Sequence, residues 1–95
     1  MPSAATTTII RGRAYTVRHA GELPTGRVGE CSHPNSPNPS LVTKKGLRGH
    51  FRMETILHEG LHASLWDLDE DAVNETAAAL ADLLWADRWR RVKHV

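Results

Sequence analysis

Two histidines separated by three residues stand in the segment His58-Glu59-Gly60-Leu61-His62. On a helix, residues i and i+4 lie on the same face, so both imidazoles can bind one metal ion. Glu59 then falls beside that ion, where a carboxylate can act as general base toward a metal-bound water. Zinc is the expected ion, because it takes imidazole and carboxylate ligands in tetrahedral geometry. A catalytic zinc keeps one position open for water, so the protein should supply three ligands.

The helix that carries these histidines should be amphipathic. On an ideal helical wheel, five small or apolar residues cluster on the side away from the two histidines, and they form the predicted core stripe: Met53, Ile56, Leu57, Gly60 and Ser64. An ordinary pair of core or surface histidines would not predict this separation. The pattern therefore favours a metal site on the accessible side of the helix.

The third ligand is expected on the next helix, where Glu70, Asn74 and Glu75 are the candidates. Side chains lean toward the N-terminus of their helix, which favours a ligand about one turn into it and selects Asn74 or Glu75. Glu70 faces the right way but lies close to the preceding loop. We choose Glu75, because zinc prefers a carboxylate over an amide and a small rotation of the helix would correct its direction. The predicted metal ligands are therefore His58, His62 and Glu75.

The elements that position these residues divide the chain into a strand-like first half and a helical second half. Apolar residues recur at helical spacing over residues 47–66 and again over residues 70–90. Gly12 marks a turn or a bulge between the first two strand-like segments. Proline and asparagine predict a loop over residues 34–39. The predicted strands are residues 6–11, 13–18, 27–32 and 40–44.

The connection between the two predicted helices is only about three residues long, which makes the helices an antiparallel pair. Asp67 with Glu70 matches a capping box, and Asp69 is an equal candidate for the cap of the second helix. The expected fold class is α+β, with a small antiparallel or mixed sheet of three to four strands followed by the two helices. Residues 1–95 form one domain, and residues 1–5 are expected to be flexible.

Composition excludes several classes of protein. The 95 residues carry a net charge of +1, which indicates no polyanionic partner such as a nucleic acid. No apolar run approaches the roughly 18 residues that a membrane span requires, and the N-terminus has no signal-peptide pattern. We therefore expect a cytoplasmic protein without membrane contact. Cys31 is the only cysteine, so no internal disulfide can form and a metal site must use His and carboxylate ligands. The sequence assigns no oligomeric state.

The segment 54–63, Glu-Thr-Ile-Leu-His-Glu-Gly-Leu-His-Ala, followed by Leu-Asp-Glu-Asp-Ala-Val at 68–73, resembles small gluzincin-like metallopeptidases. These are often encoded by phages or prophages and are distantly similar to thermolysin-type peptidases. The resemblance spans roughly residues 27–90 and implies a minimal zincin-like fold, a Zn²⁺ cofactor and a peptide or protein substrate. A glutamate of an E-x-x-A pattern completes the metal site in that family. Counting back from Ala78 gives Glu75, whereas counting back from Ala77 gives Asn74.

The resemblance also implies how a substrate is held and cleaved. In larger relatives an extended substrate pairs with an edge strand, and residues 40–44 are the candidate edge here. Tyr15, His33 and His50 are the side chains available to stabilise an oxyanion. The alternative is a non-catalytic metal-binding or interaction domain that is degenerate in its third ligand, as an asparagine at position 74 would suggest.

Overall fold

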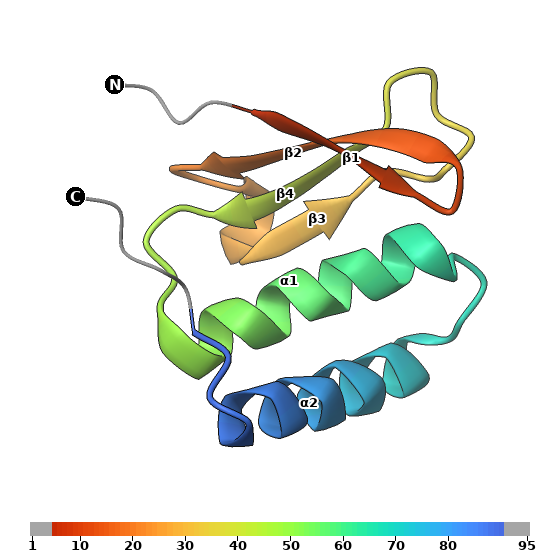
Figure 1. Cartoon of the computed structure of the whole chain (residues 1–95). Coiled ribbons are helices and arrows are strands. Elements are labelled where there is room, and N and C mark those ends of the chain that lie inside the picture. Colours follow the sequence, from red (N-terminus) through yellow and green to blue (C-terminus); the bar gives the residue numbers. More distant parts are fainter. Residues whose placement is uncertain (1–4, 91–95) are drawn as a thin grey trace.

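A four-stranded sheet lies over a pair of helices in the computed structural model, which describes residues 5–90 (Figure 1). This arrangement confirms the α+β class and the order of a small sheet followed by two helices. The segment 1–5 was expected to be flexible, and residues 1–4 of it lie outside the described residues. Within residues 5–90, no helix has the length and apolar character needed to cross a bilayer.

The first two strands form a hairpin. β1 (Thr6–Ile10) pairs antiparallel with β2 (Arg13–Ala20) across the two residues Arg11 and Gly12. Both turn residues have positive φ, +48° and +81°, as a type I′ turn requires. Gly12 adopts this conformation without a Cβ clash, so it marks a tight turn and not a bulge.

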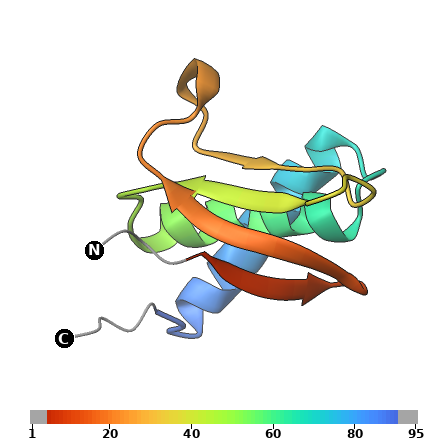
Figure 2. The ribbon, with the colours of Figure 1, turned by 90° about the horizontal axis from the view of Figure 1, so that it is seen from above.

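The sheet is mixed, with the strand order β1-β2-β4-β3. β4 (Ser40–Lys44) pairs parallel with β2, and β3 (Gly29–Cys31) pairs antiparallel with the other side of β4. Figure 2 shows β1 and β3 at the two edges. The prediction that residues 40–44 form the edge strand is therefore wrong. Three successive residues of β4, at positions 41–43, are buried, which suits an interior strand.

The helices are shorter than the periodicity predicted. α1 (Gly49–Ser64) lies against β3 and β4, and α2 (Glu70–Ala86) packs antiparallel against α1 (Figure 1). The connection between them is residues 65–69, two residues longer than expected. α2 ends at Ala86 because Arg88 takes a left-handed conformation, with a φ of +67°. Two backbone hydrogen bonds cap this end of the helix, from Arg88 N to Trp85 O and from Trp89 N to Leu84 O.

The buried face of α1 differs from the predicted core stripe. Thr55, Glu59 and Ala63 are its buried residues, and Ala63 packs with Tyr15 and Leu41 beneath the sheet. The predicted stripe, residues 53, 56, 57, 60 and 64, is only half-buried. The wheel therefore gave the wrong core face for α1. It could not show that the sheet approaches the neighbouring, more polar face, on which Glu59 lies.

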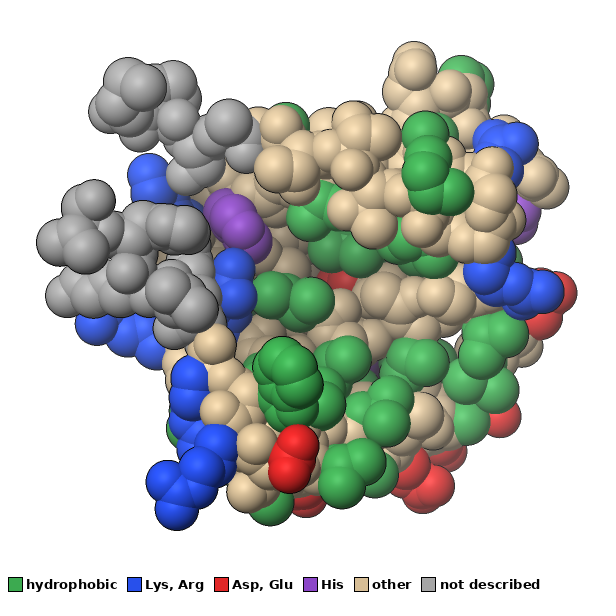
Figure 3. Space-filling model, viewed as in Figure 1, with side chains coloured by type: hydrophobic (Ala, Val, Ile, Leu, Met, Phe, Trp, Pro, Cys, Tyr) green, Lys and Arg blue, Asp and Glu red, His purple; other side chains and the backbone are tan. Residues whose placement is uncertain are grey.

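α2 packs on α1 through small side chains. Val73, Ala77 and Ala81 are the buried residues of α2. Leu80 and Leu83 remain exposed, at 36% and 64%. Figure 3 shows hydrophobic side chains gathered over the helical layer on the face that it displays. The core is consequently small, and the helix pair depends on close contact between its two members.

Candidate metal centre

His58 and His62 project from the same face of α1, one helical turn apart. Their Nε2 atoms lie 3.1 Å from one another, and the two rings meet edge to face with centroids 4.8 Å apart. Both side chains are largely buried, with 22% and 19% of their surface exposed. The i, i+4 spacing thus brings two imidazole nitrogens to one point, as the sequence predicted.

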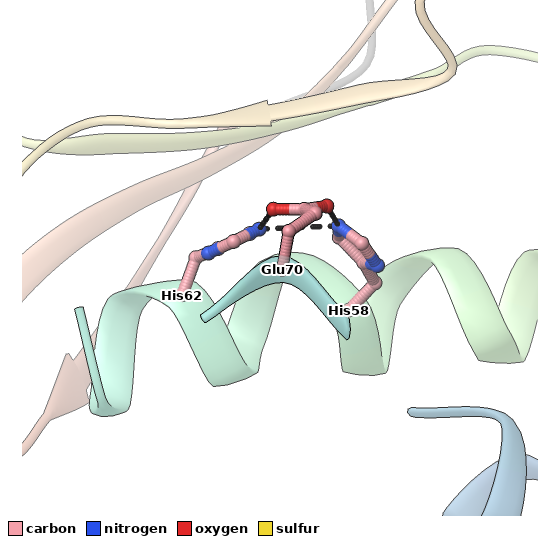
Figure 4. A group of neighbouring side chains, drawn as sticks. All are labelled: His58, His62 and Glu70. Atoms are coloured by element: carbon pink, nitrogen blue, oxygen red, sulfur yellow. Dashed lines mark hydrogen bonds and ion pairs between the residues drawn. The ribbon is translucent and has the colours of Figure 1, made fainter. Parts of the chain in front are cut away.

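Glu70 completes the group from the start of α2 (Figure 4). Its Oε1 lies 3.1 Å from His58 Nε2, and its Oε2 lies 3.2 Å from His62 Nε2. The preceding residue, Asp69, caps α2 by accepting a hydrogen bond from the backbone N–H of Ala72 at 2.8 Å. Of the two predicted caps, Asp69 therefore forms the cap, and Glu70 is the first helical residue after it.

Glu75 is exposed on α2 and does not join the two histidines. Asn74 lines the cleft described below, but it is not part of the three-residue cluster. The five-residue connection places the first turn of α2, and not its second, opposite the C-terminal half of α1. The closeness of Glu70 to the loop argued against it as third ligand in the sequence. In the structure, this same closeness brings its carboxylate to the two histidines.

The three side chains fit a zinc ion. Their ligand atoms all lie within 4.8 Å of one another, and the shortest separations are 3.1–3.2 Å. Ligands at 2.0–2.1 Å from a tetrahedral zinc stand about 3.3 Å apart. Two imidazoles and one carboxylate are also the donor set of catalytic zinc sites that keep a position for water. His58, His62 and Glu70 could therefore hold the metal.

Glu59, the predicted base, turns from α1 toward β3. It is only 6% exposed, and burial raises the pKa of its carboxyl group to about 7. Within this shift burial is the largest cause, the negative charges of Glu70 and Glu30 act in the same direction, and the charge of Arg27 lowers the pKa. A carboxyl group whose pKa lies near neutrality can both accept and donate a proton under ordinary conditions.

A cleft of about 910 Å³ lies between α1 and the β3 edge of the sheet. Its lining includes Glu59 and the three-residue cluster of His58, His62 and Glu70. Large side chains, those of Phe51 and Trp66, line it together with the cluster. The complete lining comprises residues 26–31, Phe51, Glu54, Thr55, His58, Glu59, His62, Trp66, Leu68, Glu70 and Asn74.

The backbone of β3 offers free hydrogen-bonding groups to this cleft. Lys44 N donates to Val28 O at 2.7 Å, and Ser32 N donates to Ser40 O at 2.9 Å. In an antiparallel pair, hydrogen-bonded residues alternate with residues whose N–H and C=O groups point the other way. Gly29 and Cys31, which lie between the bonded positions, therefore direct their backbone groups away from β4 and toward the open edge.

The three predicted oxyanion donors occupy different places. Tyr15 is fully buried and donates its hydroxyl proton to Ser32 O at 3.1 Å. His50 lies 2.7 Å from Asp82 on α2. Neither lines the cleft. His33 meets the ring of Trp66, a cleft residue, edge to face at 4.9 Å. The backbone N–H of residue 35 donates to His33 Nδ1, which leaves the proton of a neutral ring on Nε2.

Cys31 also lines the cleft. Burial raises the pKa of its thiol to about 11, and the charge of nearby Glu59 acts in the same direction. A thiol with so high a pKa is protonated at neutral pH.

Comparison of this chain with protein-family models, curated proteins and solved structures gives no match. The case for a function therefore depends on the geometry of the site.

Proposed function

We propose that this protein is a zinc-dependent metallopeptidase that cleaves peptide bonds by general-base-assisted attack of water. The convergence of His58, His62 and Glu70 next to the buried carboxyl group of Glu59 is the observation that supports it most strongly. The gluzincin-like resemblance of residues 54–73 supports the same conclusion. Glu70 takes the role of third ligand that the sequence had suggested for Glu75.

The metal and Glu59 would divide the chemistry between them. A zinc ion held by the three ligands would supply Lewis acidity and would lower the pKa of a coordinated water. Glu59 accepts a proton from the attacking water and then donates it to the leaving amine.

An extended polypeptide is the substrate that best fits the cleft. The outward N–H and C=O groups of Gly29 and Cys31 can pair with a peptide backbone as an added strand. Phe51 and Trp66, exposed at 52% and 37%, give substrate side chains apolar surface on which to pack. β3 thus takes the role that the sequence had suggested for residues 40–44.

Substitution of Glu59 by Gln tests this proposal. The amide preserves the shape of the side chain but cannot accept the proton, so hydrolysis of fluorescein-labelled casein should fall by at least about 100-fold. Zinc binding, measured by calorimetry, should change by less than about threefold. Glu54→Gln, which alters another cleft carboxylate one turn away, is the matched control and should retain activity.

Full zinc occupancy without hydrolysis in the wild-type protein would instead favour the non-catalytic metal-binding domain. Equal hydrolysis by the wild-type and Glu59→Gln proteins would contradict the role of Glu59.

A further inference from the structure

We propose that Gly29 is a positioning residue for Glu59, because the absence of its side chain makes the space in which the general base lies. This inference rests on the proposed function for its catalytic meaning, although the steric relationship can be tested without it. Gly29 begins β3, and its Cα faces α1 at the position of Glu59.

The steric argument comes from the space that a side chain at position 29 would need. A Cβ atom there would stand 2.7 Å from Glu59 Oε2, 2.9 Å from its Cγ and 3.1 Å from its Cδ. Separations below 3.0 Å do not occur between real Cβ atoms and their neighbours. Rotation of the carboxylate could relieve the contact with Oε2. The contact with Cγ, close to the helix backbone, could be relieved only by moving the whole side chain or the strand.

Other glycines show that this contact is specific. A Cβ at Gly21 or Gly60 would meet nothing within 4 Å, although Gly60 directly follows Glu59 in α1. φ at Gly29 is not in the left-handed region, since the glycines with positive φ are those at positions 12, 26, 46 and 49. Backbone conformation therefore does not require glycine at position 29, and the remaining requirement is the space that Glu59 occupies.

This placement also explains how one residue serves two parts of the site. The backbone groups of Gly29 face the open edge, where an extended chain would pair, while its bare Cα admits the carboxylate of Glu59. The base is thereby held beneath the strand that would carry the substrate. A larger residue at position 29 would keep the backbone groups and displace the base.

A double-mutant cycle tests the steric relationship. Gly29→Ala alone should lower the melting temperature by about 5 °C or more, because the added Cβ would overpack against Glu59 and overpacking is destabilising. In a Glu59→Ala background the same substitution should have less than half this effect, since its clashing partner is gone. Gly21→Ala is the control, because a Cβ at position 21 would meet nothing within 4 Å. It should change the melting temperature by less than about 2 °C. An equal loss in both backgrounds would overturn the proposal.

Kinetics then test the catalytic consequence. With fluorescein-labelled casein, Gly29→Ala should lower kcat by at least about tenfold, while KM and zinc affinity each stay within about threefold of the wild type. A wild-type kcat in Gly29→Ala would overturn the positioning role. Absence of hydrolysis in the wild-type protein would contradict the proposed function, but the melting cycle would still decide whether Gly29 makes the space for Glu59.

Discussion

Glu70 and Glu75 are chemically identical and five residues apart, yet only Glu70 lies beside the two histidines. Its side chain is 62% exposed, so its contacts with the two histidines contribute little stability by themselves. The same carboxylate would stabilise a bound zinc ion much more, because it would be the third protein ligand beside the two histidines.

Substitution of each glutamate by Gln separates the two positions. Glu70→Gln should weaken zinc binding by roughly 100-fold or more, since a structural zinc site gains several kcal/mol from each ligand. Glu75→Gln is the matched control and should bind zinc as the wild type does. Competition with a chromophoric chelator measures both affinities. Weaker binding in Glu75→Gln than in Glu70→Gln would reverse the assignment.

Cys31 provides a prediction about pH. Burial and the charge of Glu59 raise the pKa of its thiol from 9.0 to about 11 in the folded protein. The stability that this shift provides is present below pH 9 and is lost as the pH rises through 11. Because the thiolate is the reactive form, alkylation by iodoacetamide at pH 8.5 should be roughly 100-fold slower than in the urea-unfolded chain.

The midpoint of the rate against pH should lie near 11 in the folded protein, and it should fall in Glu59→Gln. A midpoint near 9 in the folded protein would contradict the described environment of Cys31.

At the scale of elements, the cap of α2 controls the position of Glu70, the proposed third ligand. Asp69 accepts the hydrogen bond from Ala72 N and fixes the first turn of the helix, so that Glu70 begins α2 opposite His58 and His62. The cap and the ligand are adjacent in sequence. A change in the cap should therefore affect both helix stability and metal binding.

Asp69→Ala should lower the free energy of unfolding by about 1 kcal/mol, the usual effect of removing an N-cap. It should also weaken zinc binding several-fold, because Glu70 lies in the first turn of α2 and that turn would fray without its cap. Asp67→Ala, in the same connection but without the capping hydrogen bond, should leave both quantities nearly unchanged. Urea denaturation and zinc titration give the two values. A larger effect from Asp67→Ala would show that the cap is misassigned.

Local patterns predicted the parts of the site that depend on one helix. The i, i+4 rule is sufficient to bring His58 and His62 together, and alternating or β-branched residues located all four strands. The third ligand depended on how α2 crosses α1, which the connection and the cap determine jointly. The sequence predicted residues 40–44 as the edge strand, whereas β3 forms that edge. The prediction was wrong because strand order depends on long-range pairing. No periodicity of residues 27–44 encodes that order.

Across the whole molecule, the His58, His62 and Glu70 side chains bring the two helices together at one end of a small core. α2 packs on α1 through Val73, Ala77 and Ala81, and its first residue would share a metal ion with α1. Residues of β3 line the cleft, and β3 forms the edge of the sheet opposite β1 (Figure 2). β3, Glu59 and the three residues of the proposed metal site thus line one cleft, where a single extended chain could reach all of them.

A crystal structure of the zinc-loaded protein, with anomalous scattering recorded at the zinc edge, is the most direct test of this account. We expect one anomalous peak per chain, about 2.0–2.2 Å from His58 Nε2, His62 Nε2 and a carboxylate oxygen of Glu70. A fourth position should hold water near Glu59. Absence of zinc at these residues at saturating concentration, or a peak bound by Glu75 in place of Glu70, would contradict the proposed metal centre.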